Sequence, residues 1–101
     1  MDDSANDNPL HVEIMAEKAS AYFTRVRKMQ STLAALARFD ATAASHDGQS
    51  STRRDELLSE AAEQAFFFVI QREAMKLPYY DELFADFDIP DEVRRRMGSK
   101  R

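Results

Sequence analysis

The chain has 101 residues, of which 44% are hydrophobic and 32% are charged, with a formal net charge of −4. This length predicts a single domain with a modest core. The absence of cysteine excludes disulfides, thiolate metal sites and cysteine nucleophiles, and the acidic balance disfavours non-specific binding to nucleic acid.

The N-terminal residues are acidic and almost devoid of apolar side chains, so we expect residues 1–8 to be disordered. Such a start lacks the basic and then apolar pattern of a secretory signal. No apolar run approaches the roughly 18 residues that would span a bilayer. The sequence therefore predicts a cytoplasmic protein.

Residues 9–42 carry a heptad stripe of apolar side chains. Asn8 and Pro9 form a helix start signal. The stripe advances by alternating steps of three and four residues, which predicts a long helix that lies along a partner helix. Its members are Val12, Met15, Ala19, Tyr22, Val26, Met29, Leu33 and Leu36.

A polar connector at 45–52 precedes a second predicted helix over 53–77, which Pro78 ends. A short connection favours an antiparallel hairpin. The apolar arc of the second helix has alanine at its centre and exceeds half the circumference, so it needs more than one neighbour. Phe66 and Ile70 widen this arc and Phe67 lies outside it, and we expect these three residues to bind a partner.

A polar group falls within the same arc. If the chain turns near residue 47, positions whose numbers add up to about 94 face each other along the hairpin. Arg72 then lies opposite Tyr22, and Glu73 points into the apolar sector beside it. The favoured interpretation is structural, with Arg72 stacked on Tyr22 and reaching a carboxylate in 81–88. The alternative is a ligand or partner site built from Arg72, Glu73 and Tyr22.

Two short helices are predicted at the C-terminus. Tyr80, Leu83, Phe84 and Phe87 have helical spacing, which predicts a helix over 79–87. Asp88 and Pro90 predict the start of another over 90–97, which Gly98 ends. The sequence thus predicts one helical domain over 9–98 and a frayed tail at 99–101.

The basic C-terminus is the one candidate for nucleic-acid contact: Arg94, Arg95, Arg96, Lys100 and Arg101. Arginines in a last helical turn also complement the helix dipole, and the acidic 81–92 segment beside them would repel phosphates. We favour the structural interpretation and do not expect nucleic acid to be the main partner.

No constellation for chemistry is recognisable. His11 and His46 are isolated, so no metal site is predicted, and serines lack a positioned histidine. We therefore predict no enzyme activity, no catalytic residues and no cofactor. The aromatic face lacks the basic rim typical of interfacial helices, so no membrane binding is predicted.

Three stretches resemble a family of short bacterial helical proteins classified as a domain of unknown function. They are Ala34–Asp40, Phe68–Ala74 and Ile89–Gly98, and the likeness covers about residues 10–98. The aromatic run at 66–68 and the pair Tyr79 and Tyr80 depart from it. The resemblance implies the helical fold and brings no activity, cofactor or partner.

Together, these patterns predict an all-α fold: a long, coiled-coil-like antiparallel helical hairpin with two short C-terminal helices. The surplus apolar surface predicts a homodimer that forms a four-helix bundle, or binding to another protein. The alternative is a monomer in which the C-terminal helices alone cover the second long helix. We expect a non-catalytic interaction module, an adaptor or regulator, with a nucleic-acid-associated regulator as the alternative.

Overall fold

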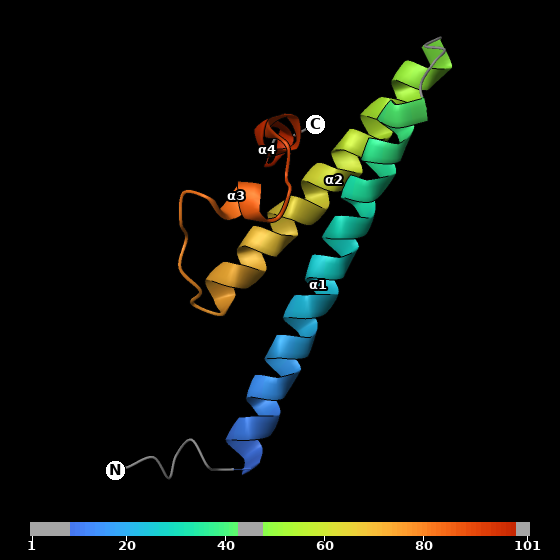
Figure 1. Ribbon diagram of the computed structural model, residues 1–101. Helices are drawn as coiled ribbons and strands as arrows, with labels where there is room; N and C mark the ends of the chain where they lie inside the picture. The colour runs from blue at the N-terminus through green and yellow to red at the C-terminus, as the bar shows by residue number, and fades with distance from the viewer. Residues whose placement is uncertain (1–8, 43–47, 99–101) are drawn as a thin grey trace.

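The computed structural model describes residues 9–42 and 48–98 (Figure 1). Over these ranges it is all-α, without strands, as predicted. Four helices follow in order: α1 (Pro9–Thr42), α2 (Gly48–Ala74), α3 (Leu83–Asp86) and α4 (Asp91–Arg96). The expectations for residues 1–8 and 99–101 lie outside the described residues.

The two long helices form the predicted antiparallel hairpin, and α3 and α4 fold back beside α2 (Figure 1). Two polar pairs define its register. Arg72 Nη1 donates to Tyr22 Oη over 2.9 Å, and Arg54 Nε donates to Asp40 Oδ1 over 2.8 Å. In both pairs the residue numbers add up to 94, so the register expected from the sequence is confirmed.

The hairpin core consists of the heptad stripe from Tyr22 to Leu36, which packs on the alanine-rich face of α2. Ala61 and Ala65 are fully buried, and Met29 fills the space above them with no exposed surface. Small side chains at the contact let the two backbones approach closely. The buried residues of the two helices are Tyr22, Val26, Met29, Leu36, Leu57, Leu58, Ala61, Ala62, Ala65 and Phe68.

Helix α2 begins and ends earlier than predicted. It starts at Gly48, where a loop was expected to continue to residue 52, because the polar residues there cost only tenths of a kcal/mol each in a helix. It ends at Ala74, before Pro78 is reached. Lys76 takes a left-handed conformation (φ 61°), and the N–H of Leu77 donates to the carbonyl of Arg72 over 3.0 Å. This is a Schellman motif.

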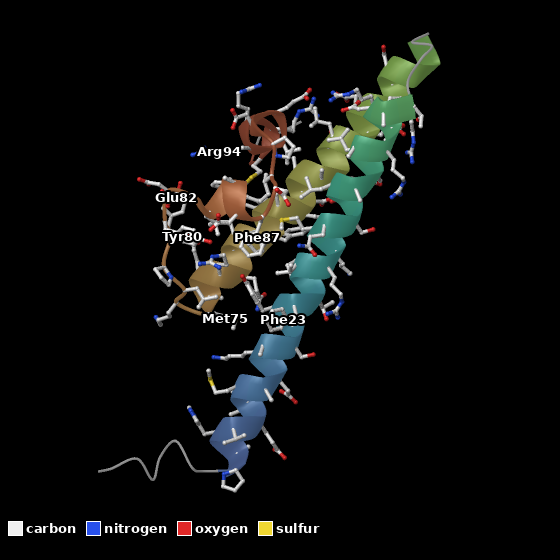
Figure 2. The ribbon with its side chains drawn as sticks, viewed as in Figure 1. Phe23, Met75, Tyr80, Glu82, Phe87 and Arg94 are labelled. Carbon is white, nitrogen blue, oxygen red and sulfur yellow. The ribbon has the colours of Figure 1, made fainter. Side chains whose placement is uncertain are left out.

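The C-terminal segment closes the other side of α2. Leu83, Ile89 and Val93 are buried against the hairpin, and the rings of Phe87 and Phe68 lie 4.8 Å apart. Figure 2 shows Tyr80 and Phe87 between this segment and α2. The hydrophobic spacing therefore identified the correct inward side chains.

The boundaries predicted for the short helices were wrong. α3 is a single turn rather than 79–87, and Pro90 stands before α4 in an extended conformation rather than inside its first turn. Asp88, expected to cap α4, instead ends α3 with φ 59°, and the N–H of Ile89 donates to the carbonyl of Phe84 over 2.8 Å. Gly98 follows with φ 72°, but Met97 before it is already extended, so α4 ends one residue ahead of the predicted stop.

The start of α1 extends beyond the end of α2 (Figure 1). In the hairpin register, Ala74, the last residue of α2, is level with Ser20, so residues 9–20 project beyond the end of α2. We call this part of the helix the α1 extension. The heptad stripe predicted contacts for Val12 and Met15, but these side chains are 52% and 47% exposed. The stripe is therefore longer than the helix that covers it.

Candidate interaction surface

Three large apolar side chains of α2 lie on its open face. Phe66, Phe67 and Ile70 are 40%, 37% and 46% exposed. Their spacing of three and four residues makes them neighbours on the helix surface, and the two phenylalanine rings lie 6.3 Å apart. We call these three residues the α2 strip. They are the residues that the sequence proposed for partner binding.

The α2 strip runs between α1 on one side and the C-terminal segment on the other. At the α1 edge, the guanidinium carbon of Arg25 lies 5.1 Å from the centroid of the Phe67 ring, and its Nη1 donates to Gln64 over 3.5 Å. At the opposite edge, Phe66 lies beside Gly98. Exposed carboxylates, Glu63 and Glu73, stand one helical turn before and after the strip. The surface is therefore apolar with acidic ends.

A row of α1 side chains lies on the same side of the hairpin. Ile14, Lys18, Ala21 and Arg25 follow a spacing of four, three and four residues, which keeps them on one helix face. Because Arg25 contacts Phe67, that face borders the α2 strip. Ile14 is an exposed apolar side chain (43%) that lies outside the heptad stripe. The sequence analysis missed this residue because it followed the stripe alone.

Arg72 contacts Tyr22 as predicted, but through a hydrogen bond to its hydroxyl. The predicted stacking on the Tyr22 ring is wrong, because the guanidinium lies over the rings of Phe68 and Tyr80, and the rest of the polar group also differs from expectation. Arg72 donates its second hydrogen bond to the carbonyl of Pro78 over 2.8 Å rather than to a carboxylate. Its guanidinium carbon lies 5.8 Å from the Tyr80 ring centroid. Glu73 is exposed, so the expectation that it points into the core is wrong. It lies on the outer side of α2, where water solvates its charge.

This arrangement gives Arg72 a structural task. It joins α1, through Tyr22, to the backbone that leaves α2 at Pro78. Nearby, the pKa of the Tyr80 hydroxyl is raised, mainly because partial burial disfavours the phenolate and then because of a hydrogen bond with Asp86. Neutral Tyr80 thus belongs to the packing of this turn.

The sequence analysis did not anticipate a second polar group that joins three helices. Arg54 of α2 donates to Asp40 of α1 over 2.8 Å and 3.1 Å, and to Glu92 of α4 over 2.8 Å and 2.9 Å. Both carboxylates raise the pKa of Arg54, and the hydrogen bonds from Arg54 lower the pKa of Glu92. Facing positions of the hairpin have numbers that add up to about 94, and this relation pairs Arg54 with Asp40. The contact between these two residues could therefore have been predicted from the sequence.

The arginines of α4 attach this helix to the protein. Arg96 donates to Ser59 over 2.6 Å and to Asp55 over 2.7 Å, and the guanidinium carbon of Arg94 lies 4.7 Å from the centroid of the Phe84 ring. Arg95 is exposed. Lys100 and Arg101 lie outside the described residues. Of the three arginines of α4, Arg94 and Arg96 therefore make contacts within the chain.

Within 9–42 and 48–98, no group of three or more His, Cys, Asp or Glu side chains could hold a metal ion. His46 lies outside these ranges, and His11 is exposed on the α1 extension. No helix among the described residues is both long enough and apolar enough to cross a membrane.

The fold is that of a helical hairpin whose second helix is braced by a C-terminal helical segment. Comparisons with protein-family models, curated proteins and solved structures find no match to this chain. The resemblance to a bacterial family of unknown function thus stays a prediction.

Proposed function

We propose that this protein is a non-catalytic interaction module, an adaptor or regulator whose α2 strip binds an apolar helix. The observation that carries the proposal is the exposure of Phe66, Phe67 and Ile70 side by side on a helix that the core holds firmly. Large aromatic and aliphatic side chains on a rigid support are typical anchors of protein interfaces.

The surroundings of the strip support a helical partner. The strip follows one helix for a little over one turn and has α1 along one edge, so an incoming helix can lie along it and contact both helices. The acidic ends, Glu63 and Glu73, favour a partner that carries basic residues next to its apolar ones. A partner is thus recognised by shape, apolar contact and charge.

Site-specific photo-crosslinking in the native cell tests this proposal. A photoreactive phenylalanine analogue at position 67 should give a covalent product on irradiation, whereas the same analogue at Ser31, on the polar face of α1, should not. Introducing Ile70→Glu together with the position-67 probe should remove the product. With the partner purified, Ile70→Glu should weaken binding by at least about 10-fold. Equal products from positions 67 and 31 would contradict the proposal.

The alternative function, nucleic-acid binding through α4, has less support. Arg96 and Arg94 already contact Asp55 and Phe84, and carboxylates of α4 lie in its first turn. Phosphates would meet both obstacles. We expect no gel shift of duplex DNA or RNA at micromolar protein and low salt. A shift that Arg95→Glu abolishes would favour the alternative.

A further inference from the structure

The α1 extension is a helix that the rest of the described chain does not cover. Residues 9–20 rise by about 18 Å along the axis, which is close to the length over which α2 presents residues 63–74. Most of the stability of a helix in a protein comes from tertiary packing of its apolar face, and this part of α1 leaves the apolar side chains of Val12, Ile14 and Met15 exposed. An apolar side chain such as Ile14, 43% exposed at its middle, gains from a neighbour.

The row of α1 side chains described above (Ile14, Lys18, Ala21 and Arg25) and the α2 strip belong to one face of the hairpin. The contact between Arg25 and Phe67 places both on the same side. One copy of the chain therefore presents a projecting apolar helix and, further along the same face, an exposed apolar strip with nothing described above it. Among the described residues, the α1 extension lacks a surface to pack on, and the α2 strip lacks a helix that covers it.

We propose that two copies of this chain associate face to face about a two-fold axis, with the α1 extension of each lying on the α2 strip of the other. This inference rests on the proposed function and names its partner as a second copy. A two-fold axis makes the contact reciprocal and closes the assembly at a dimer.

The hairpin register determines which residues meet. Phe67 is level with residue 27 of its own α1, and Ile70 with residue 24. Placing Ile14 of one copy level with Phe67 of the other puts the two-fold axis between Ser20 and Ala21. The small side chain of Ala21 allows the two α1 helices to approach closely there.

Charge favours the same arrangement. With the axis near Ala21, Glu17 of one copy comes close to Arg25 of the other, and this pairing occurs twice. Lys18 of the extension comes near Glu73 at the acidic end of the strip. Opposite charges at the rim of an interface steer association and select the register.

Pairing of one extension with another along the heptad stripe is the main competing arrangement. In an antiparallel pair, the edge that carries Lys18 and Arg25 would face the same edge of the second helix. Like charges would then oppose each other. The face-to-face arrangement avoids this repulsion and also covers the strip.

Light scattering on purified protein provides the first test. The wild-type mass should rise from the 11.6 kDa of one chain to twice that value as concentration increases. Ile14→Lys and Ile70→Glu should each weaken dimerisation by at least about 10-fold, whereas Ser31→Lys should not. Because positions 14 and 70 are both exposed, circular dichroism should show unchanged helicity in each variant.

Mixing the two variants gives the decisive result. A mixed pair has one native contact, Ile14 on Ile70, and one contact in which the new lysine meets the new glutamate. The mixture should therefore recover the dimer that neither variant forms alone. A dimer retained by Ile14→Lys and by Ile70→Glu but lost by Met15→Lys would overturn the inference in favour of extensions paired along the heptad stripe.

Disulfide trapping measures the contact directly, because the chain contains no cysteine of its own. The variant with Ile14→Cys and Phe67→Cys should form a covalent dimer on mild oxidation. Within one copy the two positions are about 20 Å apart along the hairpin, too far for a bond. A wild-type chain that stays at 11.6 kDa at every concentration overturns the dimer. The photo-crosslink at position 67 would then still decide the proposed function separately.

Discussion

At the scale of single residues, Arg72 shows how hydrogen bonds reduce the free-energy cost of placing a charged side chain inside an apolar arc. Its guanidinium carbon lies 5.9 Å from the Phe68 ring centroid and 5.8 Å from the Tyr80 ring centroid. The guanidinium donates to Tyr22 and to the Pro78 carbonyl. These contacts satisfy donors that would otherwise be costly to desolvate. Its hydrogen-bond partners come from α1 and from the segment after α2, so Arg72 supports the hairpin and the turn after α2 together.

A double-mutant cycle at Arg72 and Tyr22 measures this support. We expect Arg72→Met to lower the free energy of unfolding by about 1–2 kcal/mol and Tyr22→Phe by about 1 kcal/mol, with a smaller loss in the double variant than the sum. Urea denaturation of the four proteins gives these values. Loss of partner binding by Arg72→Met with an unchanged denaturation midpoint would instead assign Arg72 to a binding site.

Lys76 also has a conformation that its residue type disfavours. Its φ of 61° ends α2, and a left-handed conformation costs a side-chain-bearing residue about 1 kcal/mol relative to glycine. Lys76→Gly should therefore raise the thermal midpoint, with a gain in stability of up to about 1 kcal/mol measured by thermal denaturation. Lys76→Ala, which removes the charge and keeps the strain, is the control. A destabilised glycine variant would contradict this account.

At the scale of elements, the alanine face of α2 determines how closely the two long helices pack. Ala61 and Ala65 have no exposed surface, and Phe68 follows them on the same face. The heptad stripe on α1 and this small-residue face on α2 are complementary in size, with Met29 and Leu36 as the large partners. Packing, rather than helix propensity, thus accounts for the hairpin.

Ala65→Leu should disturb this contact. The added atoms have no room between the helices, so we expect a loss of about 1–3 kcal/mol in the free energy of unfolding, measured by chemical denaturation. Glu60→Leu places the same side chain on the exposed side of α2 and should change stability by less than about 0.5 kcal/mol. A neutral Ala65→Leu would mean that the helices meet through a different face.

At the scale of the whole molecule, the group formed by Arg54, Asp40 and Glu92 joins α1, α2 and α4. Glu92 is 46% exposed, so its ion pair is screened by solvent. Its lowered pKa nevertheless gives a defined pH dependence. The folded state favours the charged carboxylate, so this stabilisation is present above its usual pKa of 4.5 and is lost as the pH falls through the lowered value.

Comparison of wild type with Glu92→Gln across pH tests this linkage. At pH 7 the variant should be less stable by up to about 1 kcal/mol. The difference should shrink as the pH falls below about 4.5, because Glu92 then becomes neutral in both folded and unfolded chains. Thermal denaturation at several pH values measures it. A difference that stays constant down to pH 3 would contradict the role assigned to this carboxylate.

Local sequence signals determined the two long helices, their antiparallel pairing and their register. A heptad stripe, a polar connector and a small-residue face act through neighbouring residues or through one continuous contact, so their periodicity can be read from the chain. For this reason the sequence placed Tyr22 opposite Arg72. It also identified Phe66, Phe67 and Ile70 as apolar residues that the hairpin alone does not cover.

Only the tertiary structure decided where each apolar face finds cover. The stripe continues through Val12 and Met15, but α2 ends at Ala74 because a Schellman motif forms around Lys76, and no periodicity reveals that end. The partners of Arg54 and Arg96 depend on how α4 docks, which involves positions distant in sequence. The side of the hairpin shared by Ile14 and Phe67 follows from the contact of Arg25. Such facts depend on relative helix rotation, which a single sequence does not encode locally.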